Sequence, residues 1–303
     1  MYRSFLSPIN DYSNLPFRLL CQKYGAEATC IPLINATRVV SSKIALDANP
    51  KEKNLGIQLV NNNPREIGKA CKIIDALVPF VSWYNINCGC PSSRTMGYGG
   101  GSAMLEFPEK IVESALEMKK NIDKPVSVKI RMKPNFAETL SLCKKLENVD
   151  VDFLIIHGRT AKQGYSGNAD WEAIKALKKA LSIPIVGNGD IMNAQHGEEM
   201  IKQGYCDSFM ICRAAMSNPM VFINSKARAR VLLEEYISLC NEYLGKAEVH
   251  DVKIKAINFL RGSKNAAASR NRIMKAKTIE ELILCVDALH GSETSSRQFL
   301  WQQ

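Results

Sequence analysis

The chain alternates short apolar runs with longer amphipathic stretches, and this alternation is the sequence feature that most restricts its fold. Eight apolar runs have the length of buried strands, and helix-like patterns lie between them. We predict strands over residues 4–8, 28–33, 56–60, 82–87, 126–131, 152–157, 183–187 and 208–212. We predict helices over, for example, residues 64–77, 108–121, 137–146 and 171–181. The first two of these helices begin with a proline, which fits a first helical turn.

Eight strand–helix units within residues 1–224 predict an α/β fold, specifically a (β/α)8 barrel, which needs roughly 200–250 residues. A doubly wound parallel sheet is the alternative, and it gathers its ligands at one switch point. Here polar residues lie within or just beyond the carboxyl-terminal ends of many predicted strands. They include Asn10, Gln58, Asn87, Lys129, Arg131, His157, Arg159, Asn188 and Arg213. Polar groups at so many carboxyl ends favour the catalytic mouth of a barrel.

The alternation stops near residue 225, and helical patterns follow over residues 227–244, 252–260, 266–274 and 279–289. We therefore predict a barrel domain over residues 1–224 and a small all-α domain over residues 225–303.

Composition is that of a soluble globular protein, with 46% hydrophobic and 23% charged residues. No apolar stretch reaches the roughly 18 residues that span a bilayer, and the N-terminus does not resemble a signal peptide. The ten cysteines are scattered, which favours a reducing compartment, so we expect a cytoplasmic protein. Cys88 and Cys90 lack the spacing of a zinc site, and we expect neither a metal nor a membrane partner. A monomer is the default expectation.

The segment from Asn87 to Pro91 places two thiols directly after the fourth predicted strand, and a glycine-rich run at 99–101 follows. A loop at the carboxyl end of a strand is where α/β proteins bind small molecules. Of the two thiols, Cys90 lies further into the loop, so it is the candidate functional thiol. A buried structural thiol is the alternative, but the position between Gly89 and Pro91 argues against core packing.

Three polar residues interrupt otherwise apolar strands: Gln58, Lys129 and His157. A buried lysine is costly unless it meets an anion or an acceptor, although a lysine at a strand end can also extend to solvent. The segments 187–191 and 212–219 follow the last two strands, where barrels commonly bind phosphate. Tight βα turns are the alternative interpretation of these two segments.

The helical tail is strongly basic, in a chain whose formal net charge is +10. No acidic residue lies between positions 253 and 277, where the basic residues are Lys253, Lys255, Arg261, Lys264, Arg270, Arg272, Lys275 and Lys277. Such segregation is typical of a protein that binds a nucleic-acid backbone, and a solvated helix face is the alternative.

These motifs together resemble the tRNA-dihydrouridine synthases, a family of flavoenzymes. The resemblance covers most of the chain and rests on the segments 87–91 with 101–105, 15–18, 128–131, 157–160, 187–191 and 218–219. It implies FMN-dependent reduction of the C5–C6 double bond of uridine in tRNA, with NADPH or NADH as reductant. It also implies that the helical domain holds tRNA.

The resemblance further implies residue roles. Cys90 would be the catalytic acid that protonates C5, since a thiol can serve as a general acid. Contacts to FMN would come from Ser7, Pro8, Gln58, Lys129, His157, Asn188, Gly189, Asp190, Cys212 and Arg213. From the resemblance and the basic pattern together, we expect contacts to the tRNA from Asn87, Arg94, Arg131, Arg159, Lys253, Lys255, Arg261, Lys264, Arg270, Arg272 and Lys275. Surface solvation is the alternative for Arg94.

The chain departs from the family pattern at Ser7–Ile9, Pro32–Leu33 and Cys212–Ala214, and the last departure adds Cβ atoms beside the expected phosphate site. Two other functions stay open. A flavin barrel could act on a free pyrimidine or enone, although the basic tail would then have no role. A barrel without catalysis could bind RNA, although Asn87, Cys90, Lys129 and His157 argue against it.

Overall fold

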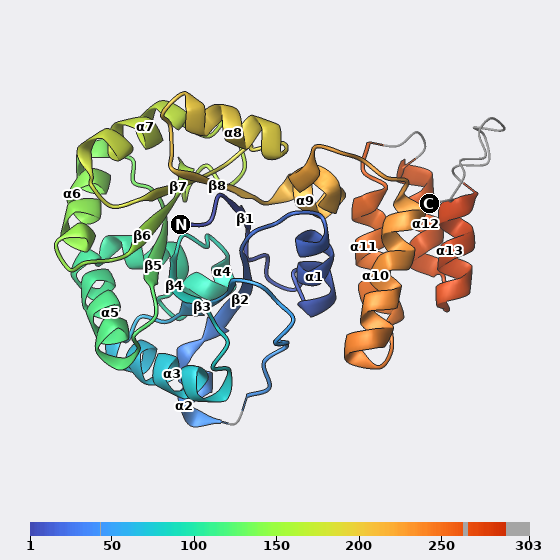
Figure 1. Ribbon diagram of the computed structural model, residues 1–303, viewed down its shortest axis with the longest axis horizontal. Coiled ribbons are helices and arrows are strands. Elements are labelled where there is room, and N and C mark those ends of the chain that lie inside the picture. Colours follow the sequence, from blue (N-terminus) through green and yellow to red (C-terminus); the bar gives the residue numbers. More distant parts are fainter. Residues whose placement is uncertain (43, 263–265, 289–303) are drawn as a thin grey trace. The chain divides into compact units, whose positions relative to one another are not determined.

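The computed structural model describes residues 1–42, 44–262 and 266–288, and the chain forms two compact units (Figure 1). One unit comprises residues 1–215 and 220–225, and the other comprises residues 216–219 and the chain from residue 226 onward. In the first unit the chain alternates between strands and helices, whereas the second is built from helices.

Eight parallel strands form one sheet in the order β1-β8-β7-β6-β5-β4-β3-β2. A parallel bridge between Phe5 and Ala28, directly before β2, joins the two edges into a nearly closed barrel. The strands are β1 (Ser4–Leu6), β2 (Thr29–Asn35), β3 (Leu55–Val60), β4 (Trp83–Cys88), β5 (Val126–Met132), β6 (Phe153–Thr160), β7 (Ile185–Asn188) and β8 (Ser208–Ile211). The predicted (β/α)8 barrel is confirmed.

Helices connect the strands and surround the sheet (Figure 1). They are α1 (Leu15–Lys23), α2 (Ala36–Ser41), α3 (Pro64–Leu77), α4 (Ser93–Gly97), α5 (Pro108–Asn121), α6 (Phe136–Glu147), α7 (Trp171–Ala180) and α8 (Ala194–Lys202). Helix α9 (Arg213–Ser217) follows the last strand, β8. Asn63, Asn135 and Asp170 accept backbone N–H groups at the starts of α3, α6 and α7. These caps satisfy amides that the first helical turn leaves without partners, and so fix where each helix begins.

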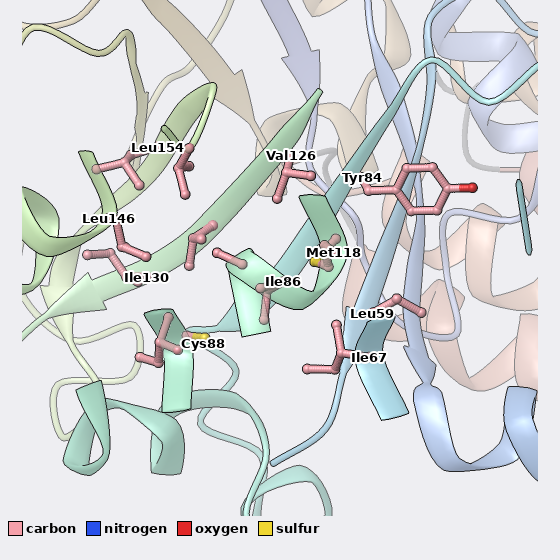
Figure 2. Close-up of a cluster of buried hydrophobic side chains, with 14 of the residues drawn as sticks. Leu59, Ile67, Tyr84, Ile86, Cys88, Met118, Val126, Ile130, Leu146 and Leu154 are labelled. Atoms are coloured by element: carbon pink, nitrogen blue, oxygen red, sulfur yellow. The ribbon is translucent and has the colours of Figure 1, made fainter. Parts of the chain in front are cut away.

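Successive side chains of each strand point to opposite faces of the barrel wall. Tyr84, Ile86 and Cys88 of β4 lie in the apolar layer between the sheet and the helices (Figure 2). Trp83, the first residue of β4, instead packs inside the barrel against Phe5 and Phe153, with ring centroids 5.5 to 5.9 Å apart. We call these three rings the aromatic plug; they fill the barrel interior near the amino-terminal ends of the strands.

The second unit contains α10 (Ala229–Leu244), α11 (Val249–Phe259), α12 (Ala266–Lys275) and α13 (Ile279–Asp287). Its buried side chains include Leu232, Tyr236, Val252 and Leu282. Gly245 has a φ of +79° and ends α10 in the left-handed conformation that glycine adopts most readily. Within the described ranges, no helix is long and apolar enough to cross a membrane.

The plug generates a stability prediction at Gly56 of β3. A Cβ atom at this position would lie 2.2 Å from Cε2 of Trp83, closer than any relaxed contact. We expect Gly56→Ala to lower the free energy of unfolding by roughly 1–3 kcal/mol, because the plug cannot move without strain. Urea unfolding measures the change.

Gly97→Ala is the matched control, because a Cβ at Gly97 meets nothing within 4 Å. We expect it to change the free energy of unfolding by less than about 1 kcal/mol. Equal effects of the two substitutions would contradict the packing described for Trp83.

Candidate active site

Polar side chains gather inside the barrel at the carboxyl ends of its strands. Gln58, Asn87, His157 and Asn188 are buried, and Lys129 is half-buried. Each sits on the inward face of its strand, whereas Cys88 at the end of β4 lies in the outer apolar layer. Alternation along the strands therefore brings together residues predicted from five separate segments of the sequence.

A series of side-chain hydrogen bonds crosses β5, β4 and β3 to reach the loop that carries Cys90. Asn85 Nδ2 donates to Ser127 Oγ, Gln58 Nε2 donates to Asn85 Oδ1, and Asn87 Nδ2 donates to Gln58 Oε1; each distance is 2.8 Å. Asn87 Oδ1 then accepts the backbone N–H groups of Gly89 at 3.1 Å and Cys90 at 2.9 Å. We call these four side chains the amide relay.

One hydroxyl group sets the direction of the amide relay. Ser127 Oγ donates its proton to the Tyr84 carbonyl at 3.0 Å, so it can only accept from Asn85. The NH2 group of Asn85 must then face Ser127, which turns its oxygen toward Gln58. Gln58 then donates to Asn85 with its NH2 group, so its own oxygen accepts from the NH2 group of Asn87. The oxygen of Asn87 therefore faces the Cys90 loop.

The Cys90 thiol is half-buried in the mouth of the barrel. Its Sγ lies 3.6 Å from Thr95 Oγ1, and its carbonyl accepts the Ser102 N–H at 2.9 Å. Gly101 has a φ of +62°, and a Cβ there would lie 2.5 Å from the Cys90 carbonyl oxygen. The glycine-rich run following the thiol therefore packs directly on Cys90, and only glycine fits at position 101.

Lys129 and His157 stand in different charge states. Burial lowers the pKa of Lys129 to about 8, which still leaves it mostly protonated at neutral pH. Its Nζ donates to Asn188 Oδ1 at 3.1 Å, and Asn188 Nδ2 donates to the Met210 carbonyl at 3.0 Å. Burial, together with the charges of Lys129 and nearby arginines, lowers the pKa of His157 far below its ordinary range. The site thus combines one lysine cation with a neutral imidazole.

Asp190, after β7, holds two guanidinium groups. Arg159 donates to both carboxylate oxygens at 2.7 and 2.9 Å, and Arg213 donates to Oδ1 at 2.7 Å. Burial opposes ionisation, but the Ala169 N–H and Arg159 outweigh it, so the pKa of Asp190 is lowered. Gly189, with a φ of +127°, lets the chain turn here, because a Cβ would lie 2.6 Å from Ala169 Cβ.

Arg131 and Arg159, predicted to bind substrate, are buried and bonded to the loop that follows β6. Arg131 donates to the carbonyls of Gly89, Thr160 and Gly164 at 2.8 to 3.0 Å. Arg159 donates to the Gly167 carbonyl at 2.6 Å. Arg131 therefore ties the Cys90 loop to the β6 loop.

Tyr165 is a site residue that the sequence interpretation missed. Its side chain is 60% exposed, and its ring lies 5.0 Å from the Arg213 guanidinium carbon and 5.8 Å from that of Arg131. A tyrosine held between two cations offers a flat aromatic face beside the mouth. Tyr165 lies in an irregular loop after β6, so no strand or helix periodicity in the sequence marks it as a site residue.

Ser7 and Cys212, predicted at the cofactor site, follow the neighbouring strands β1 and β8. Ser7 is buried, whereas Pro8 and Cys212 are half-buried. Burial raises the pKa of Cys212, and its hydrogen bond with Ser7 partly opposes that shift. The Cys212 thiol is therefore neutral at physiological pH.

In the helical unit, Arg261, Arg270, Arg272 and Lys275 are exposed, and Lys253 is half-buried with its Nζ donating to the Met274 carbonyl. Arg94 is exposed on α4 of the barrel unit. Lys264 lies outside the described residues.

The assignment of Lys255 to the tRNA surface is wrong. Its side chain is fully buried, its Nζ lies 3.1 Å from Asp251 Oδ1, and it stands 5.0 Å over the ring of Tyr236. A lysine enclosed in this way is part of the core of the helical unit and cannot reach a phosphate.

Comparisons with known proteins identify relatives of the whole chain. The family model described as dihydrouridine synthase matches residues 5–283. A probable tRNA-dihydrouridine synthase of Aquifex aeolicus is 31% identical, over 98% of this chain and 97% of that protein. The tRNA-dihydrouridine synthase B of Pasteurella multocida is 32% identical, over 73% of this chain and 68% of that protein.

Among solved structures, histamine dehydrogenase from Rhizobium sp. 4-9 is similar in fold, with a TM-score of 0.56 and 13% identity. The match covers 78% of this chain and 49% of that structure, so this chain spans about half its length. At this identity the likeness supports the barrel fold alone.

The neutral state of buried His157 generates a pH prediction. Below about pH 6.5 the unfolded chain binds a proton at this residue while the folded chain does not, so stability falls as pH falls. We expect this one group to contribute a slope of about 1.4 kcal/mol per pH unit below that point. Urea unfolding between pH 7 and 4.5 should show a smaller slope for His157→Gln. An unchanged slope would contradict the buried, neutral imidazole.

Proposed function

The chain belongs to the dihydrouridine synthase family, and we propose that it reduces the C5–C6 double bond of specific uridines in tRNA. The proposed cofactor is FMN, with NADPH or NADH as the reductant. The observation that carries this proposal is the meeting of Cys90, on its fixed loop, with Lys129, His157 and Asn188 in one barrel mouth.

The chemistry of this mouth fits a reduced flavin. When bound, such a flavin supplies the hydride for C6 of the uracil ring. Lys129 offers a cation beside a neutral His157, which suits the negative charge that a reduced flavin carries near N1 and O2. Arg213, after β8, offers a second cation for a phosphate group. We propose that Gln58, Asn188, Gly189 and the residues around Ser7 and Cys212 complete this cofactor site.

We propose that Cys90 acts as the general acid that delivers a proton to C5. Its Sγ–H bond breaks as the C5–H bond forms, and the charge remains on sulfur. The Asn87 oxygen supports this role, because it holds the Gly89 and Cys90 amides and so fixes the loop carrying the thiol. Cys88 has no such role, since it is fully buried on the outer side of the barrel wall.

The proposed tRNA partner is supported by the charge of the helical unit. Helix α12 contains no acidic residue and exposes Arg270, Arg272 and Lys275. A uridine has to leave its base stack before a barrel mouth can enclose it, and such extrusion accompanies shape recognition of folded RNA. We propose catalysis in residues 1–224, tRNA binding in residues 225–303, and a cytoplasmic site of action.

The reaction is tested by mass spectrometry of unmodified tRNA incubated with the protein, FMN and NADPH. We expect a gain of two hydrogens on a uridine with the wild type. Cys90→Ala should slow this gain about 100-fold or more, because general acids contribute rate factors of that order. Cys88→Ala is the matched control and should retain the reaction.

Two results would overturn parts of this proposal. Reduction at the wild-type rate by Cys90→Ala would exclude this thiol as the acid. An FMN-loaded protein that NADPH reduces but that leaves every tRNA uridine unchanged would favour a free small molecule as substrate.

The basic helix generates a separate prediction. Replacing Arg270, Arg272 and Lys275 together by glutamine should weaken tRNA binding and lower the slope of log affinity against log salt by about 2–3. Gel shifts at several salt concentrations measure both quantities.

The control removes three exposed lysines from the barrel helices α3, α6 and α7: Lys72, Lys144 and Lys179. It changes the net charge equally and should leave the salt slope near the wild-type value. Identical slopes for the two triple variants would show that total charge, rather than α12, governs binding.

A further inference from the structure

The Thr95 hydroxyl lies 3.6 Å from the sulfur of Cys90, and we propose that it is a second catalytic group. This inference rests on the proposed function of Cys90 as the proton donor. The Thr95 hydroxyl accepts the thiol proton in the resting site, and it donates to the sulfur once the proton has moved to C5.

The position of Thr95 is fixed from several sides. It lies in α4, its residue is only 2% exposed, and its Oγ1 is 3.6 Å from Cys90 Sγ. The Gly100 N–H donates to its carbonyl at 3.2 Å. A Cβ at Gly101 would lie 2.8 Å from Thr95 Cγ2, so the glycine-rich run closes directly over the methyl group. Water therefore has little access to the hydroxyl, and the thiol is its neighbour.

The chemistry of a hydroxyl suits both stages of the step. A hydroxyl carries one donor and two acceptor lone pairs, so it can accept from the S–H and later donate to the sulfur by rotating. Proton delivery breaks the Sγ–H bond, forms the C5–H bond and leaves a negative charge on sulfur. A donor placed at the atom where charge develops stabilises the transition state more than the resting state. Solvent then returns a proton to the sulfur.

The amide relay and Thr95 act on different parts of the same residue. Asn87 Oδ1 holds the backbone N–H of Cys90, and Thr95 Oγ1 meets its side chain. The relay therefore sets where the sulfur lies, whereas Thr95 sets how readily the sulfur carries charge. A role in packing alone would let valine, which has nearly the same shape as threonine, replace Thr95 without chemical effect.

The first test needs neither cofactor nor tRNA. Alkylation of Cys90 by iodoacetamide at pH 7.5, followed by peptide mass spectrometry, reports the reactivity of its sulfur. A hydrogen bond donated to an anionic sulfur is stronger than one accepted from a neutral thiol, so the hydroxyl stabilises the anionic sulfur that attacks the reagent. We expect Thr95→Val to slow alkylation about three- to tenfold, and Thr95→Ser to restore it. An unchanged or faster rate in Thr95→Val would overturn the proposal.

The second test uses the FMN-loaded enzyme with tRNA. We expect Thr95→Val to lower kcat for uridine reduction by a similar factor with little change in KM, because Thr95 acts on the proton step rather than on binding. Thr95→Ser should recover most of kcat. Equal kcat in wild type and Thr95→Val would overturn the role of Thr95 and leave the proposed reaction standing. Absence of uridine reduction in the wild type would instead overturn the proposed function. The alkylation result would still show whether the Thr95 hydroxyl acts on the Cys90 sulfur.

Discussion

The hydrogen bonds that join Ser127, Asn85, Gln58 and Asn87 cross three neighbouring strands and end at the backbone of Cys90. All of these side chains are buried, so a break at any point leaves polar groups without partners at a cost of about 1–3 kcal/mol each. The direction of every amide follows from one hydroxyl, because Ser127 donates to a backbone carbonyl. The barrel wall thus imposes one orientation on Asn87, and Asn87 imposes one position on the Cys90 loop.

Burial also sets the charge states of the side chains around the Cys90 loop. Lys129 keeps a positive charge while His157 is held neutral, and Asp190 draws Arg159 and Arg213 to one side of the mouth. Arg131 joins the Cys90 loop to the β6 loop through backbone carbonyls. The same strands that carry these groups are packed at their amino-terminal ends by Trp83 and its aromatic neighbours. A rigid polar mouth of this kind suits the proposed flavin and nucleobase.

The sequence predicted the barrel because its strands and helices follow clear periodicities, and Pro64 and Pro108 mark helix starts that the structure keeps. It singled out Lys129 and His157 because each interrupts an apolar strand. Asn85 and Ser127 carry the same signal, yet their role depends on contacts between strands that one sequence does not display. Thr95 and Tyr165 lie in irregular or very short segments. Lys255 was assigned wrongly because the basic pattern gives the charge of α11 but not which face of the helix is buried.

The central claim is that an interstrand relay places Cys90 for proton delivery to uridine. Single-turnover formation of dihydrouridine by Asn85→Leu, with FMN and NADPH, tests it most directly. Asn85 is fully buried and three hydrogen bonds separate its side chain from the backbone of Cys90, so it acts through the relay. The account predicts a folded variant with a rate at least about tenfold lower, equivalent to roughly 1.4 kcal/mol of lost transition-state stabilisation. A folded Asn85→Leu protein that forms dihydrouridine at the wild-type rate would contradict it.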